Sequence, residues 1–97
     1  MSADEEALWS LSETAAASGA AFLTPLGPMI MAAARLGAAS DSRGFARRFG
    51  VAHALVIREC VSLAEDLGLI AIEDRGGKSQ RLFFELTERG RRLCGEH

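Results

Sequence analysis

The sequence lacks most of what catalytic metal sites and membrane-bound proteins require. Its 97 residues include two cysteines and two histidines, with neither CxxC spacing nor a plausible metal-ligand cluster. No run of about 18 apolar residues is present, which argues against a membrane-spanning helix. The chain opens with Asp4, Glu5 and Glu6, whereas an export signal begins with positive charge. We therefore expect no cofactor, no metal, no membrane contact and a cytoplasmic location.

Catalytic groupings are missing as well. The sequence shows no nucleophile–base pair and no phosphate-binding glycine loop, so an enzyme is the least favoured class. Cys60 and Cys94 each stand alone. Small buried hydrophobic residues are the preferred interpretation of both, and a redox-sensing pair is the weaker alternative.

The two signs of charge are unevenly distributed along the chain, whose net charge is −2. Residues 1–24 contain four acids and no base. The remaining residues contain all 11 bases and the other nine of the 13 acids, a local balance of +2. Because attraction to phosphate depends on the local surface and not on the sum, the total does not exclude nucleic acid.

The composition predicts one globular domain over residues 1–97, with 48% hydrophobic and 25% charged residues. An alanine-rich segment with an acidic first turn predicts a helix over 3–18, and proline at Pro25 and Pro28 marks the start of the next. The pattern of apolar residues and glycines predicts further helices over 26–38, 42–49, 52–67 and 87–96, and strands over 69–74 and 81–86.

The segment 52–67 has a well-defined inward face. Val56, Cys60, Leu63 and Leu67 are separated by four, three and four residues, which places them on one stripe of a helix. Ser40 or Asp41 is suited to cap the N-terminus of the predicted helix over 42–49. The face opposite the stripe carries Ala54, Arg58, Val61, Ser62 and Glu65.

The predicted N-terminal helix has a thin apolar stripe at Leu8, Leu11 and Ala15, with Trp9 beside it. We expect this stripe to contact a second copy of the chain, because the rest of the sequence can form a compact unit without it. The alternative is a helix that packs within its own chain.

The order of elements and several short motifs resemble the winged helix-turn-helix superfamily, over residues 25–93. Gly68-Leu69-Ile70 is similar to the passage from recognition helix to wing, and the run from Leu86 to Leu93 is similar to the end of the wing in MarR and PadR regulators. The segment Arg81-Leu82-Phe83-Phe84-Glu85 resembles the PadR type. The recognition helix is one residue longer before Gly68 than in the common pattern. Small, turn and apolar positions of the motif match Ala46, Gly50, Val51, Val56 and Cys60.

This resemblance implies a mainly α fold with a small β-hairpin wing over residues 25–93. The apolar stripe described above adds a predicted N-terminal dimerisation helix and link over 1–24. It implies sequence-specific binding of double-stranded DNA by a homodimeric transcriptional regulator, with an effector left open. The 52–67 helix would enter the major groove, and a wing over 73–81 would touch the backbone or minor groove. The expected DNA-binding residues are Ser42, Arg43, Arg47, His53, Ala54, Arg58, Ser62, Arg75, Lys78 and Arg81.

Several of these residues have a structural alternative. Arg58 is suited to bind guanine or phosphate, or to pair with Glu65 or Asp66. Arg47 and Arg48 equally suit a solvated face, and His53 equally suits a capping or partly buried role. For the whole chain, the alternative function is a winged helix that contacts another protein and binds DNA weakly or not at all.

Overall fold

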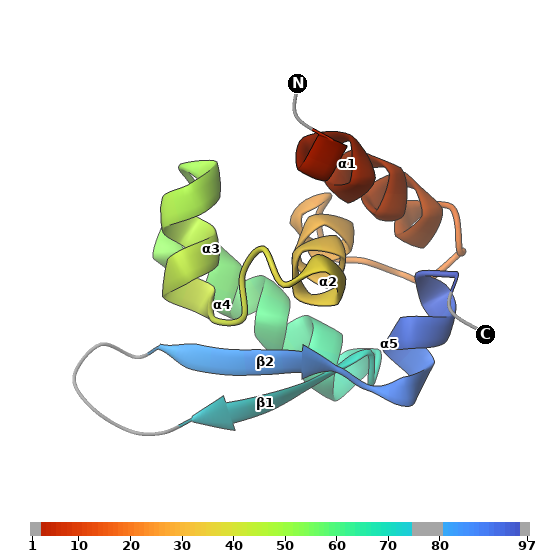
Figure 1. Ribbon diagram of the computed structural model, residues 1–97. Coiled ribbons are helices and arrows are strands. Elements are labelled where there is room, and N and C mark those ends of the chain that lie inside the picture. Colours follow the sequence, from red (N-terminus) through yellow and green to blue (C-terminus); the bar gives the residue numbers. More distant parts are fainter. Residues whose placement is uncertain (1–2, 75–80, 96–97) are drawn as a thin grey trace.

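The computed structural model describes residues 3–74 and 81–95, and these form a mainly helical protein with one two-stranded antiparallel hairpin (Figure 1). The predicted combination of helices and a small hairpin is confirmed. The helices are α1 (Ala3–Ala16), α2 (Leu26–Leu36), α3 (Ser42–Phe49), α4 (His53–Val61) and α5 (Glu88–Leu93). The π-helix η1 (Ser62–Asp66) continues α4, and the strands are β1 (Ile70–Asp74) and β2 (Leu82–Leu86).

Most boundaries lie within two residues of the prediction, but the segment 52–67 is not one continuous α-helix. Beyond Val61 the chain widens into η1, where the Leu67 N–H donates to the carbonyl of Ser62, five residues earlier. A π turn contains more residues than an α turn. The wider turn leaves Leu63 buried on the inward stripe.

The core is centred on α2, as the sequence predicts. Ile30, Met31, Ala32 and Ala33 are all fully buried, and α2 contacts α1, α4 and β2. Gly37 ends this helix in the left-handed conformation with φ 72°, and its N–H bonds the carbonyls of Ala33 and Ala34. Because α1, α4 and β2 cover α2 from several sides, most of the circumference of this helix is buried.

The α1 helix packs within its own chain, which is the alternative that the sequence left open. Leu8 and Ala15 are buried against the core, together with Ser12. Neither side chain is available to a second copy while α1 stays on α2. Only Trp9, 45% exposed, and the half-buried Leu11 remain at the surface from the predicted set.

The hairpin is joined to the segment that precedes α3. The two strands pair from Ile70↔Leu86 to Asp74↔Leu82. On its other edge, β2 forms a bridge between Phe83 and Asp41, and the Phe84 N–H donates to the Ser40 carbonyl at 2.9 Å. In Figure 1 the hairpin runs along the side of the molecule opposite α1. These pairings place β2 beside the N-terminal end of α3.

A buried carboxylate that the sequence analysis overlooked links α4 to the start of α2. Glu59 is 1% exposed, and its two oxygens accept the backbone N–H of Thr24 at 3.2 Å and the Thr24 hydroxyl at 3.0 Å. The same hydroxyl accepts the Leu26 N–H. Since a buried charge needs hydrogen-bond donors, these contacts fix the link between α1 and α2 against α4.

Replacing Gly27 with alanine is expected to destabilise the protein by about 1–3 kcal/mol, because the added Cβ has no space. It would lie 2.6 Å from Glu59 Oε1 and 2.7 Å from Phe22 Cδ1. Helix propensity alone favours alanine over glycine by about 1 kcal/mol. The steric clash and the higher helix propensity of alanine thus have opposite effects on stability, and urea unfolding shows which is larger. A Gly27→Ala variant more stable than the wild type would contradict the prediction.

Candidate nucleic-acid interface

A tight turn connects α3 to α4. Asp41 caps α3 by accepting the Gly44 N–H at 2.9 Å, which selects it over Ser40 as the capping residue. Gly50 ends α3 with φ 65°, a left-handed conformation that glycine adopts without strain. The Val51 N–H donates to the Ala46 carbonyl, and α4 begins at His53. Only three residues separate the two helices, which fixes how they cross.

The inward faces of α3 and α4 pack as their spacing predicts. Phe45, Val56, Cys60 and Leu63 are fully buried. Phe45 also contacts Phe49, with ring centroids 4.5 Å apart. The burial of one face leaves the opposite face of α4 in solvent, where Ala54 and Arg58 are exposed and Ser62 is half-buried.

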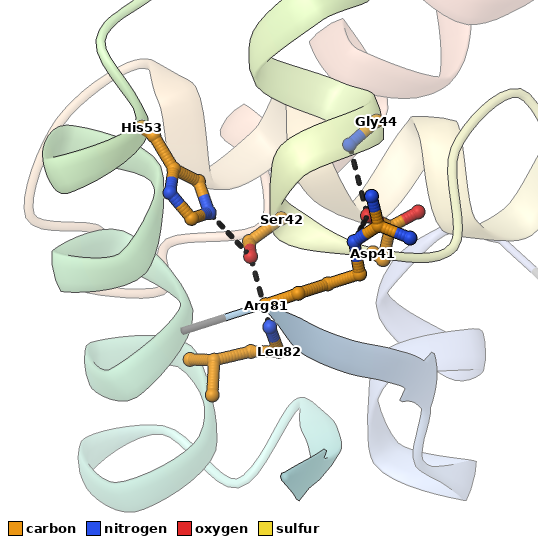
Figure 2. A network of polar contacts seen from close by, with 6 residues as sticks. All are labelled: Asp41, Ser42, Gly44, His53, Arg81 and Leu82. Atoms are coloured by element: carbon orange, nitrogen blue, oxygen red, sulfur yellow. Dashed lines mark hydrogen bonds and ion pairs between the residues drawn. The ribbon is translucent and has the colours of Figure 1, made fainter. Parts of the chain in front are cut away.

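Ser42 is placed differently from its predicted role as a phosphate contact. Its side chain is fully buried at the first turn of α3, and its Oγ accepts the Leu82 N–H at 2.9 Å. The same oxygen lies 2.8 Å from His53 Nε2 (Figure 2). Because β2 and α4 enclose this hydroxyl, it cannot reach a ligand in solvent without leaving its position. His53 is half-buried here, the alternative that the sequence left open.

Arg81 lies beside the same cluster as the partner of Asp41. Its Nε is 3.2 Å from Asp41 Oδ2, with the two side chains 38% and 17% exposed (Figure 2). The carboxylate thus serves both the α3 N-terminus and Arg81. Part of the positive charge of Arg81 is neutralised within the chain, which reduces what it offers to a phosphate.

The other predicted basic residues divide by exposure. Arg47 and Arg48 are exposed on α3, and the Arg48 guanidinium carbon lies 5.8 Å from the centroid of the Phe49 ring. Arg43 is half-buried. In the described part of the chain, Arg58 forms no ion pair with Glu65 or Asp66. Arg75 and Lys78 lie outside the described residues.

The exposed face of α4 is more apolar than a uniformly basic DNA-binding surface. Leu55 is 52% exposed and Val61 is 38% exposed. A cavity of about 370 Å³ opens between this helix and the start of α2. Its lining combines apolar side chains with one base and one acid: Leu23, Thr24, Pro25, Leu26, Met29, Leu55, Arg58 and Glu59.

Among the described residues, the pKa of one cysteine beside the site is strongly shifted. Burial foremost, and the Glu59 carboxylate in addition, raise the pKa of Cys60 to about 12, so this cysteine remains a thiol. Cys60 and Cys94 are both buried and free. Within residues 3–74 and 81–95, no three His, Cys, Asp or Glu side chains converge as a metal site.

The pKa of His53 is lowered from its ordinary value. Burial is the largest cause, the positive charges of Arg43 and Arg81 act in the same direction, and Asp41 acts against them. The imidazole is therefore kept neutral more readily than a solvated histidine.

Lowering the pH from about 7.5 to about 5.5 is expected to reduce the free energy of unfolding through His53, whose unfolded pKa is about 6.5. With the folded pKa below the unfolded one, the unfolded chain binds more protons as the pH falls through this range. The stability due to neutral His53 is thus present above the unfolded pKa and is lost toward the folded pKa. Urea unfolding at both pH values measures this loss of stability. If the free energy of unfolding of His53→Gln fell by the same amount between the two pH values, the prediction would be contradicted.

No helix in the described ranges has both the length and the apolar character needed to cross a bilayer. Comparison of the chain with protein-family models, with curated proteins and with solved structures finds no match.

Proposed function

We propose that the chain is a small winged helix protein that binds double-stranded DNA sequence-specifically as a homodimer and regulates transcription. One observation supports this most strongly: the buried Ser42 hydroxyl joins α3, α4 and β2 at one point. This contact holds α3, α4 and the first residue of β2 beside one another, and such an arrangement supports the interpretation as a helix-turn-helix followed by a wing.

In this proposal α4 enters the major groove, which is about 12 Å wide and admits an α-helix. Arg58 lies on the exposed face with the small residue Ala54 one turn before it, so the backbone can approach the base edges. Arg58 would bind guanine O6 and N7, or a phosphate. Arg47 on α3 would contact the backbone beside it, and the wing over 73–81 would reach an adjacent phosphate or the minor groove.

The dimer contact is proposed on the surface that α1 leaves exposed. Trp9 borders a hollow that also includes the exposed Leu23 of the link between α1 and α2. A symmetric contact there would repeat the recognition helix, and a separation of roughly 34 Å would match one turn of DNA. Trp9→Ser is expected to lower the apparent mass in analytical ultracentrifugation, whereas Arg89→Ser on α5 serves as the control.

The test of DNA binding begins with selection of duplexes from a random pool at low salt. We expect enrichment of a sequence with two-fold symmetry, and an affinity that falls steeply as salt rises, because phosphate contacts release counterions. A purified chain that retains no duplex at low salt would contradict the proposal.

Contact with another protein is the second candidate, and the apolar side chains on α4 favour it. Leu55 lines the cavity at Leu23, and Val61 is exposed as well, although contact with base edges requires neither apolar side chain. The two functions predict different results for Leu55→Ser. This variant should leave the salt dependence of DNA binding unchanged, and should abolish association with a protein partner if that contact is the function.

A further inference from the structure

The hydrogen bonds of the Ser42 hydroxyl favour one protonation state of His53 Nε2. A serine hydroxyl has one proton to donate and can accept from other groups. The Leu82 N–H already donates to Ser42 Oγ at 2.9 Å, and His53 Nε2 lies 2.8 Å from the same atom. If Nε2 is unprotonated, it accepts the hydroxyl proton, and both the hydroxyl and Nε2 have a partner. A protonated Nε2 would instead donate a second N–H to the same oxygen and leave the buried hydroxyl proton without this acceptor.

The charges around the ring favour the unprotonated form. His53 is the first residue of α4, where the helix dipole disfavours a cation. Arg43 from α3 and Arg81, which immediately precedes β2, add positive charge. Asp41, which precedes α3, is the opposing charge, and it is already bound by the Gly44 N–H and by Arg81. Figure 2 shows His53, Asp41 and Arg81 at the junction of α3, α4 and β2.

We propose that Ser42 and His53 are positioning residues that form a pH-sensitive latch, which holds the hairpin against the α3–α4 pair. In the closed latch the Ser42 hydroxyl donates to Nε2 of neutral His53, whose own proton is on Nδ1, and accepts the Leu82 N–H. When His53 takes up a proton from solvent at Nε2, the ring becomes a donor to Oγ, and the buried hydroxyl proton loses its acceptor. The Ser42–His53 contact weakens, and with it the support of the first residue of β2.

The latch goes beyond the proposed function, and only its consequence for DNA rests on that function. A DNA-binding surface composed of α4 and the hairpin requires a fixed position of one relative to the other. Neutral His53 contributes to this position, together with the contacts of β2 to Ser40 and Asp41, and acid weakens its contribution. Ser42 therefore acts through the hairpin and not through a direct contact with phosphate.

The test uses the full chain without DNA, so its outcome is independent of DNA binding. At about pH 8, nitrogen NMR of His53 should show a proton on Nδ1 and an unprotonated, hydrogen-bonded Nε2. As His53 titrates, the protection of the Leu82 amide from hydrogen exchange should fall by about tenfold, the loss expected for one hydrogen bond. The Thr87 amide, which donates to the Leu69 carbonyl at the far end of the hairpin, should keep its protection.

Two variants complete the test. His53→Gln should make Leu82 protection independent of pH, and Ser42→Ala should remove it at every pH. If Ser42→Ala fails to fold, the pH dependence of Leu82 protection in the wild type and in His53→Gln still tests the latch. A proton on Nε2 at about pH 8, or Leu82 protection that stays constant through the His53 titration, would overturn the latch. Equal losses at Leu82 and Thr87 would also overturn it, since they indicate general unfolding by acid.

Discussion

Replacing Arg58 with alanine is expected to weaken binding to the selected duplex by about 1–3 kcal/mol, the contribution of a bidentate guanidinium–guanine contact. Arg58 is the exposed base of α4, on the face opposite the buried stripe formed by Val56, Cys60 and Leu63. The contact carries sequence information, so the loss should be greatest for the selected duplex and smaller for a random one. Fluorescence anisotropy with both duplexes at a fixed salt concentration measures the difference.

Arg89→Ala provides the matched control for Arg58→Ala. Arg89 is also exposed and lies on α5, away from the α3–α4 pair. Both substitutions remove one positive charge, so any effect of net charge alone is shared. If the two variants lose the same affinity, or if neither loses any, Arg58 does not have the proposed role.

Replacing Phe45 with alanine is expected to lower the free energy of unfolding by about 3–5 kcal/mol. Phe45 is fully buried where α3 packs on α4, and its ring contacts Phe49. Removal of the ring loses apolar burial and leaves a cavity that the crossing of two fixed helices cannot close. Urea unfolding followed by circular dichroism measures the loss.

Phe49→Ala is the control for Phe45→Ala, because it makes the same chemical change at a less buried position. Phe49 lies one turn further along the same helix and is half-buried. The same chemical change should therefore cost clearly less than at Phe45. A larger loss at Phe49 would indicate that the α3–α4 contact is centred elsewhere.

The parts of the fold that depend on neighbours in sequence were predictable. The helix over 42–49 matches α3, because the Asp41 cap and Gly50 mark its two ends locally. The 4-3-4 spacing after Val56 correctly identified the buried Cys60 and Leu63, whereas Leu67 at the end of the stripe is half-buried. Helix periodicity and end signals are read within one or two turns, so they need no knowledge of tertiary contacts.

The roles of Ser42 and Glu59 were missed because their partners are remote. Ser42 bonds Leu82, 40 residues away, and Glu59 bonds Thr24, 35 residues away. Glu59 did leave a signal, since it lies three residues after Val56 and four before Leu63, on the inward stripe. A carboxylate at such a position predicts a buried and hydrogen-bonded acid. No comparable signal in the sequence distinguished Ser42 from a solvent-exposed helix start.

The burial of Leu8 and Ala15 shows a similar limit. An apolar stripe on a helix indicates that the stripe is covered, but it does not identify what covers it. Here α2 covers it within the same chain. The proposed dimer contact therefore moves to Trp9 and Leu23, which the structure leaves exposed.

Amide chemical-shift mapping on addition of the selected duplex tests the central claim most directly. The proposal predicts the largest perturbations at Arg47, Ala54 and Arg58, with smaller ones along β2 and none on α5. Perturbations confined to the surface around Trp9 and Leu23, or no perturbation at low salt, would contradict a DNA-binding role for the α3–α4 pair.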